Sequence, residues 1–157
     1  MREQVLEREQ FIPLPIEEAF APFGAVGNLQ AITPEWLHFR ILSDPDAELE
    51  QGSVIEYRLR LHGFPIRWRT VIESWDPPHR FTDIQVKGPF ALWHHTHTFE
   101  AVEGGTMVRD RVRYRIGFGP MGDLAHRLLV KRDLERIFDY RREAVPRLLK
   151  EEAASAG

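Results

Sequence analysis

The stretch that decides the fold is Thr106–Ile116, TMVRDRVRYRI, because its side chains alternate between two kinds. One face carries Met107, Arg109, Arg111, Arg113 and Arg115, and the other carries Thr106, Val108, Asp110, Val112, Tyr114 and Ile116. A period of two is typical of an antiparallel strand with one face in water and one in the core. Asp110 interrupts the apolar face, and a buried carboxylate is costly unless it is paired. We therefore expect a polar partner for Asp110 inside the protein.

The preceding strand, residues 91–102, contains the histidine-rich run WHHTHTFE. By the same alternation, the face that carries aromatic residues, and is therefore expected to be buried, holds Trp93, His95, His97 and Phe99. A two-residue turn directly after Val102 would place His97 opposite Asp110. Directly opposed residues have Cβ atoms about 4.5–5.5 Å apart, so an imidazole is the predicted partner of the carboxylate.

The rest of the chain adds strands before this pair and a helix after it. We expect strands at residues 5–12, 39–42, 53–61, 64–75 and 81–86, with two short helices between the first two strands. A turn at His62-Gly63 would set Tyr57 opposite Trp68. Apolar residues at helical spacing then predict one long amphipathic helix over about residues 121–150, loosened near its end by Pro146. Its apolar stripe is formed by Leu124, Leu128, Leu134, Ile137, Phe138, Val145 and Leu148, with Arg141 beside it and expected to reach inward.

Composition narrows the class of protein. The 157 residues predict one domain at residues 1–150 and a short flexible tail at 151–157. The net charge of −3 and the pI near 6.2 argue against a nucleic-acid partner. The arginine-rich face is expected to be balanced on other strands by Glu7, Glu9, Glu56, Glu73 and Glu100. No apolar run approaches the ~20 residues of a membrane span, and the charged first residues, MREQVLEREQ, exclude a signal peptide, so we expect a cytoplasmic protein without stable membrane insertion.

The pair of His97 and Asp110 has three interpretations. It is a structural pair in which the two groups satisfy each other, a polar anchor in a ligand cavity, or an acid–base pair for catalysis. A metal site formed by His95, His97 and Asp110 is disfavoured because the His-X-His spacing is common by chance, and the absence of cysteine removes thiolate ligands. We expect no metal and no cofactor, and the remaining loop and helix histidines are expected at the surface, at His38, His62, His79 and His126.

The order of one strand, two short helices, a meander of six strands and one long helix resembles the helix-grip fold of the START-like, or SRPBCC, superfamily. That superfamily includes lipid-transfer domains, the birch-pollen allergen class and aromatic polyketide cyclases. The stretches TPEWLHFRI, GFPIRWRTVI, GPFALWHHTHTF, GGTMVRDRVRYRI and RDLERIFDYR resemble a bacterial subgroup related to polyketide cyclase/dehydrase and lipid-transfer domains. The resemblance implies an α+β fold in which a curved antiparallel sheet of about seven strands wraps around the C-terminal helix and encloses an elongated cavity.

The expected function is binding or transport of a small hydrophobic ligand, such as a lipid, fatty acid, isoprenoid or aromatic polyketide. The ligand-binding residues predicted from the inward-facing positions are Tyr57, Leu59, Trp68, Trp93, His95, His97, Phe99, Asp110, Val112 and Tyr114. One alternative is a cyclase or dehydratase with His97 as base, Asp110 orienting it and Tyr114 as proton donor. Another is a non-catalytic interaction module, which would need an exposed apolar patch that the alternating strands do not show.

Overall fold

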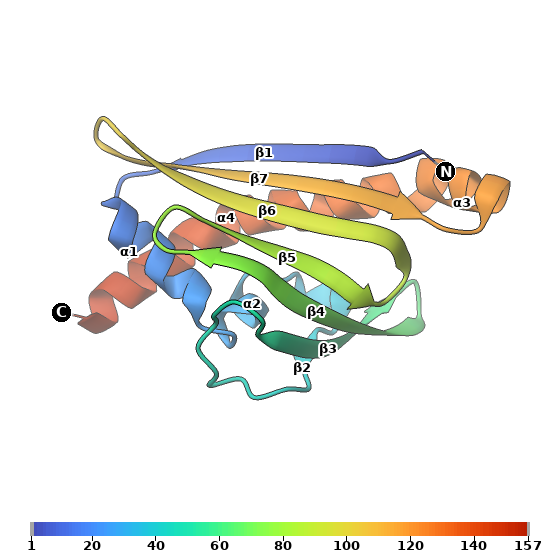
Figure 1. Ribbon diagram of the computed structural model, residues 1–157, viewed down its shortest axis with the longest axis horizontal. Coiled ribbons are helices and arrows are strands. Elements are labelled where there is room, and N and C mark those ends of the chain that lie inside the picture. Colours follow the sequence, from blue (N-terminus) through green and yellow to red (C-terminus); the bar gives the residue numbers. More distant parts are fainter. Residues whose placement is uncertain (1, 157) are drawn as a thin grey trace.

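The computed structural model describes residues 2–156, which form a single seven-stranded sheet with helices on its concave side (Figure 1). The strands are β1 (Gln4–Ile12), β2 (Arg40–Ile41), β3 (Val54–Leu61), β4 (Phe64–Asp76), β5 (Arg80–Lys87), β6 (Phe90–Val102) and β7 (Gly105–Ile116). Their order across the sheet is β1-β7-β6-β5-β4-β3-β2, and neighbouring strands are antiparallel. The predicted α+β class and strand number are confirmed.

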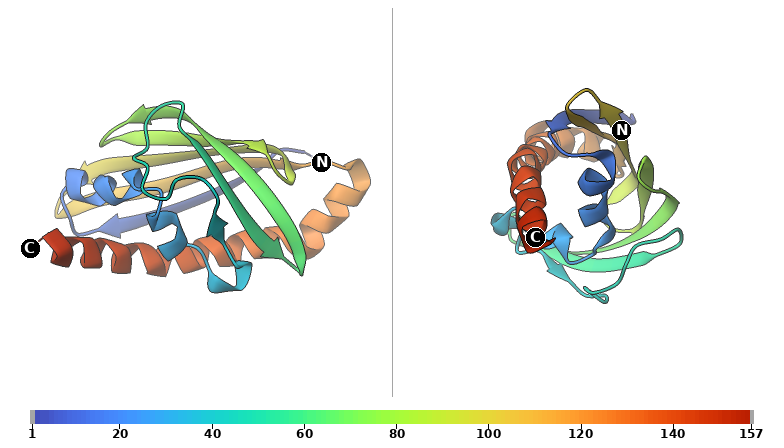
Figure 2. Two further views of the ribbon diagram at one scale, coloured as in Figure 1. Left: turned by 90° about the horizontal axis from the view of Figure 1, so that it is seen from below. Right: turned by 90° about the vertical axis from the view of Figure 1, so that its left-hand side faces the viewer.

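Short helices connect β1 to β2, and a longer helical region follows β7. The first group contains α1 (Ile16–Phe20), α2 (Asn28–Ala31) and 3₁₀ turns at Ala21–Gly24 and Glu35–Leu37, and the second contains α3 (Gly119–Ala125), a π-helical segment (His126–Val130) and α4 (Lys131–Ala156). Figure 2 shows that the sheet curves around the molecule and that α4 runs along its open side. No helix in the described range 2–156 is long and apolar enough to cross a membrane.

The C-terminal helix differs from its prediction at both ends. Helical structure begins at Gly119, and α4 continues to Ala156, so the residues up to 156 in the expected tail are helical and the predicted end near Lys150 is wrong. Pro146 lies inside α4 and cannot donate to the carbonyl of Arg142. That carbonyl instead accepts a hydrogen bond of 2.6 Å from Nε2 of Gln10 on β1. A side chain from the sheet thus compensates for the bond that proline removes.

Two hairpin turns set the register of the inward-facing residues. His62 and Gly63 both have positive φ, at 50° and 81°, as a tight two-residue hairpin turn requires, and Tyr57 pairs with Trp68. The second turn pairs Val102 with Gly105, so that His97 lies opposite Asp110, as the alternation predicts.

The outward face of β7 is covered by ion pairs. Arg109 contacts Glu9 at 3.3 Å and Glu100 at 2.5 Å, Arg111 contacts Glu7 at 3.5 Å, and Arg113 contacts Glu3 at 2.9 Å. Elsewhere on the sheet, Arg69 on β4 contacts Glu56 on β3 at 2.6 Å, and His94 on β6 lies 3.9 Å from Glu73 on β4. Three of the four arginines on the face of β7 are therefore paired with glutamates, and Glu7, Glu9 and Glu100 are partners that the sequence predicts, whereas Glu56 and Glu73 pair elsewhere.

Candidate ligand cavity and its histidine–aspartate cluster

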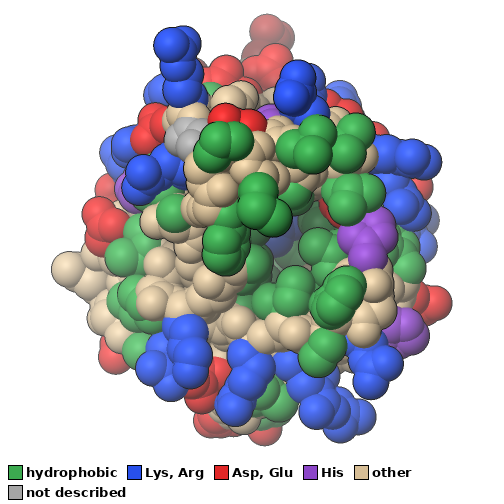
Figure 3. Space-filling model, turned by 90° about the vertical axis from the view of Figure 1, so that its right-hand side faces the viewer, with side chains coloured by type: hydrophobic (Ala, Val, Ile, Leu, Met, Phe, Trp, Pro, Cys, Tyr) green, Lys and Arg blue, Asp and Glu red, His purple; other side chains and the backbone are tan. Residues whose placement is uncertain are grey.

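A cavity of about 250 Å³ lies between the concave face of the sheet, α4 and the short helices. Figure 3 shows the end of the molecule near α3 hollowed at its centre, with hydrophobic side chains around the hollow. The wall is mostly apolar and draws on most elements of the fold. Its members include Leu29, Ile32, Leu37, Phe39, Ile55, Leu59, Leu61, Ile66, Ile72, Phe90, Leu134, Ile137 and Phe138.

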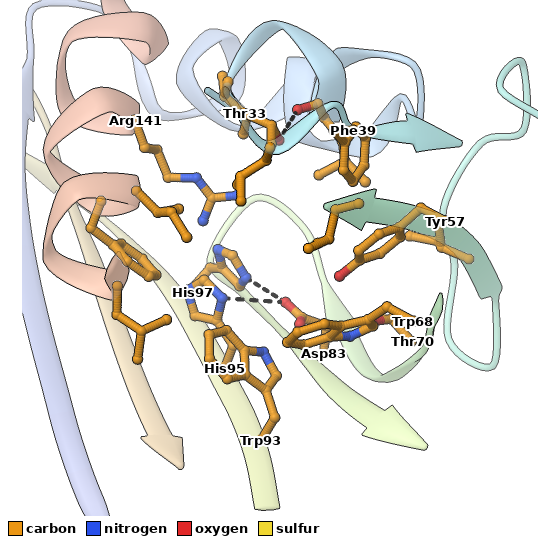
Figure 4. A pocket seen from close by; sticks show the side chains of 18 of the residues that line it. Thr33, Phe39, Tyr57, Trp68, Thr70, Asp83, Trp93, His95, His97 and Arg141 are labelled. Carbon is orange, nitrogen blue, oxygen red and sulfur yellow. Dashed lines mark hydrogen bonds and ion pairs between the residues drawn. The ribbon is translucent and has the colours of Figure 1, made fainter. Parts of the chain in front are cut away.

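Three aromatic side chains form one side of this wall (Figure 4). Tyr57 stacks on Trp68, with ring centroids 5.8 Å apart and planes inclined by 16°. Trp93 meets Trp68 edge to face at 5.2 Å. The indole N–H of Trp68 donates to the hydroxyl of Thr70 at 3.0 Å, so its one polar atom is satisfied. The aromatic surface is rigid because each ring is held by the next.

Two histidines and two aspartates form a ring of polar contacts beside the aromatic wall, which we call the histidine–aspartate cluster (Asp83, His95, His97 and Asp110). Nε2 of His97 lies 2.7 Å from Oδ2 of Asp83, and its Nδ1 lies 3.2 Å from Oδ1 of Asp110. Nε2 of His95 lies 2.8 Å from Oδ1 of Asp110, and its Nδ1 lies 3.7 Å from Asp83. The two imidazoles stack at 3.7 Å, so each carboxylate faces both rings.

Strand pairing brings the cluster together. Asp83 on β5 lies opposite His95 on β6, and Asp110 on β7 lies opposite His97. All four positions point to the concave face because residues two apart on a strand share a side and directly paired residues do too. Phe81, two residues before Asp83, stacks on the imidazole of His97 at 3.9 Å and closes the cluster on one side.

The protonation of the cluster is asymmetric. Burial opposes ionisation of Asp83 and Asp110, but the two imidazoles outweigh it and hold the pKa of both carboxyls below the usual range, that of Asp110 well below. Burial and the neighbouring His97 lower the pKa of His95. Burial also acts against the charge of His97, yet hydrogen bonds to Asp110 and Asp83 raise its pKa. The cluster therefore favours two carboxylates, a charged His97 and a neutral His95.

Two further polar groups share the cavity with the cluster. Arg141 projects from α4 toward the histidines in Figure 4, so its expected inward orientation is confirmed. Its positive charge also helps to lower the pKa of Asp83. The phenol of Tyr57 is buried, and burial together with the charge of Asp83 raises its pKa, which keeps it a neutral hydrogen-bond donor.

The ten residues predicted to bind a ligand divide into two groups. Six lie on the cavity wall: Tyr57, Leu59, Trp68, Trp93, His95 and His97. The structure does not bring the other four, Phe99, Asp110, Val112 and Tyr114, to that wall. Phe99 and Val112 are in the hydrophobic core, Asp110 lies behind the histidines, and the hydroxyl of Tyr114 is 2.8 Å from Nε2 of His126.

Sequence reasoning missed five polar residues of the wall and misplaced one histidine. The missed residues of the wall are Asn28, Thr33, Thr70, Asp83 and Asp133, and Asp133 is only 4% exposed. It contacts His62 from the β3–β4 turn at 2.8 Å. His126 is buried against Tyr114, so its predicted surface position is wrong, whereas His38 and His79 are exposed as expected. No local pattern marks these contacts, since each joins two different elements of the fold.

The region around α3 exposes apolar side chains that the strand alternation could not reveal. Leu124 and Leu128, expected in the buried stripe, are 50% and 64% exposed. Other exposed apolar side chains in this region and at the β3–β4 hairpin are Phe64, Phe118, Met121 and Leu129. The buried part of the stripe therefore starts only with α4.

Several solved structures share this fold with the chain. The chain is similar to the Zhui aromatase/cyclase from Streptomyces sp. R1128 (TM-score 0.78, 15% identity, 99% of each chain covered). It is similar to a norcoclaurine synthase from Thalictrum flavum, solved with a transition-state analogue (TM-score 0.69, 12% identity, 97% of each chain). It also resembles Ara h 8.0201 (TM-score 0.62, 18% identity, 92% of this chain and 98% of that one). These likenesses establish the helix-grip fold.

No curated protein matches the sequence. A family match exists, however, and it extends from residue 3 to residue 147, which is nearly the whole domain. The family is described as polyketide cyclase/dehydrase and lipid transport, in agreement with the curved sheet and the cavity on its concave side. The chain therefore belongs to this family.

Proposed function

We propose that this protein binds a small, largely apolar molecule, with one polar end, in the cavity between the sheet and α4. The observation that carries the proposal is the distribution of polarity on the wall. Most of the lining is aromatic or aliphatic, and charged groups gather where Asp83, His95, His97 and Arg141 meet. Ligand sites are typically apolar pockets with a few convergent polar groups, which is the composition found here.

The two parts of the wall suggest how such a molecule lies. Its apolar body would contact Leu59 and the stacked rings of Tyr57 and Trp68, while an oxygen at its other end would accept from Arg141. The cavity of about 250 Å³ is slightly below the range of about 300–1,000 Å³ typical of ligand pockets. Among lipids, fatty acids, isoprenoids and aromatic polyketides, a compact ring system or short chain is therefore favoured. We place this activity in the cytoplasm.

Native mass spectrometry of gently purified protein tests the proposal. A discrete excess over the denatured mass, of a few hundred daltons, is expected and would give the mass of the ligand. The Leu59→Trp variant fills the cavity and should lose that excess, whereas Val86→Trp, at a half-exposed position on β5, should keep it. Equal binding by both variants, or no binding of any apolar compound by the wild type, would overturn the proposal.

A second candidate is cyclase-type catalysis, and the opposite pKa shifts of the two histidines favour it. A charged His97 beside a neutral His95 places an acid and a base next to each other at the cavity wall. In this version Asp110 still orients His97, while Tyr57 replaces Tyr114 as the phenol that faces the cavity. Turnover of poly-β-ketone or β-hydroxy carbonyl substrates that His97→Gln lowers and His94→Gln retains would support it, and no turnover would count against it.

A further inference from the structure

Three potential metal ligands converge at the cavity wall. Asp83, His95 and His97 each offer one ligand atom, and these atoms all lie within 4.8 Å of one another. Around Oδ2 of Asp83, Nε2 of His97 lies at 2.7 Å and Nδ1 of His95 at 3.7 Å. Figure 4 shows both imidazoles directed at this carboxylate from the same strand, β6.

The remaining nitrogen of each ring is already held by a second carboxylate. Oδ1 of Asp110 lies 2.8 Å from Nε2 of His95 and 3.2 Å from Nδ1 of His97. In metal sites, a histidine ligand commonly donates its other ring N–H to a carboxylate, which fixes the tautomer and the ring orientation. We propose that Asp83, His95 and His97 bind one divalent transition-metal ion and that Asp110 orients the two imidazoles toward it.

The spacing and the charge of the cluster suit such an ion. Tetrahedral zinc with bonds of about 2.0–2.1 Å requires ligand atoms about 3.3 Å apart, and the two distances to Asp83, 2.7 and 3.7 Å, lie on either side of this value. Binding would displace the proton that His97 carries, and the two carboxylates with two neutral imidazoles would then hold two negative charges, which a divalent cation neutralises. Imidazole with one carboxylate is a ligand set that suits zinc, iron(II) or cobalt(II).

The site would keep an open position. Asp83, His95 and His97 line the cavity, whereas Asp110 lies behind them and away from that wall. Three protein ligands with a free fourth position facing a cavity are typical of catalytic rather than structural zinc sites. The burial of both histidines, 3% and 4% exposed, gives the ligands fixed positions.

Arg141 opposes the binding of a cation at this place. Its side chain lines the same cavity wall and projects toward the two histidines (Figure 4). Removal of that charge should therefore strengthen metal binding. The Arg141→Gln variant is expected to bind the ion several-fold more tightly than the wild type, a change that a purely hydrogen-bonded cluster would not produce.

The test uses cobalt(II) and zinc(II) on the full chain after treatment with a chelator. One equivalent of cobalt(II) is expected to bind with the intense visible bands of tetrahedral coordination, and zinc(II) should displace it and raise the melting temperature. Proton NMR of the wild-type cobalt protein should show hyperfine-shifted resonances from two imidazoles. This readout does not depend on whether any variant folds.

Matched variants then identify the ligands. Asp83→Asn, His95→Gln and His97→Gln should each weaken zinc binding by about tenfold or more, and Asp110→Asn by roughly 10- to 100-fold. His94→Gln removes a neighbouring histidine on the opposite face of β6 and should leave affinity unchanged. Circular dichroism confirms that each variant is folded before it is compared.

Two results would overturn the inference. One is the absence of stoichiometric cobalt or zinc binding by the wild type, and the other is binding that His94→Gln abolishes and Asp83→Asn retains. Either would leave the cluster as a buried ion-pair network. Failure of this test would leave the proposed binding of an apolar molecule untouched. That proposal is tested at Leu59 on the aromatic side of the wall, through the mass of the bound ligand and not through metal binding.

Discussion

The hydroxyl of Tyr114 lies 2.8 Å from Nε2 of His126, which ties the end of β7 to the π-helical segment that precedes α4. Both side chains are buried, at 4% and 7% exposure, and their polar atoms satisfy each other. Burial lowers the pKa of His126, which favours a neutral imidazole as the hydrogen-bond partner of the phenol. The phenol is thus used to join two elements of the fold.

Tyr114→Phe should lower the free energy of unfolding without changing the affinity for an apolar ligand. The loss is about 1 kcal/mol or somewhat more, because His126 loses its partner while buried. Urea denaturation and ligand titration measure the two quantities. Tyr57→Phe is the comparison, since that hydroxyl belongs to the cavity wall and its loss should alter binding. Weaker binding by Tyr114→Phe at unchanged stability would contradict this assignment.

Asp110→Asn should destabilise the protein strongly. Asp110 is the shared partner of His95 and His97, and its replacement leaves the charged His97 with Asp83 as its only carboxylate in the cluster. Breaking a buried ion pair by removal of one partner costs roughly 3–5 kcal/mol. The control is Glu9→Gln, an exposed partner of Arg109 on the outer face, which should cost about 1 kcal/mol or less. Similar losses for the two variants, measured by urea denaturation, would argue against a tightly coupled cluster.

Alkaline pH should destabilise the protein through Tyr57. Because its pKa is raised in the fold, its contribution is fully present below the unfolded pKa of about 10 and is lost as pH rises above that value. As pH rises, the unfolded chain releases this proton first. The free energy of unfolding therefore falls more steeply with pH, by at most ~1.4 kcal/mol per pH unit. Tyr57→Phe should show a shallower decline than the wild type above pH ~10, and Tyr140→Phe serves as the control. Parallel curves for the wild type and Tyr57→Phe would refute the prediction.

Phe118→Asn should stabilise the protein. Phe118 has φ +71° and is 83% exposed, so it combines a left-handed backbone with little packing. Asparagine tolerates this conformation better than phenylalanine, and the expected gain is about 1 kcal/mol. Phe64→Asn, at a position that is also largely exposed but lacks positive φ, should bring no gain. Thermal unfolding of the two variants checks the difference.

The sequence predicted the sheet and half of the cluster because those features depend on alternation and on short turns. His97 could be placed opposite Asp110 by counting from a two-residue hairpin, and the structure has that register. Asp83 could not be found in the same way. Counting from a two-residue turn at Gly88-Pro89 would place it opposite His94, on the wrong face, whereas β5 and β6 pair in a register shifted by one residue that sets it opposite His95.

Contacts between distant elements explain the other differences. Pro146 predicts a helix that weakens near residue 150, yet Gln10 on β1 takes over the carbonyl of Arg142, and α4 continues to Ala156. The burial of Asp133 likewise depends on His62, a residue in a turn more than 70 positions away in the sequence. Periodicity within one segment carries no information about such partners.

The contact between His62 and Asp133 has a consequence for the rate of ligand exchange. It joins the β3–β4 turn to the first part of α4, and its neighbours Leu61 and Val130 line the cavity, so the contact lies at the rim. An interaction that is the same in the empty and the filled protein cancels from the equilibrium constant, but it would have to open for a ligand that enters at this end of the cavity. His62→Ala should therefore raise the association and dissociation rate constants by a similar factor in stopped-flow experiments and leave their ratio unchanged.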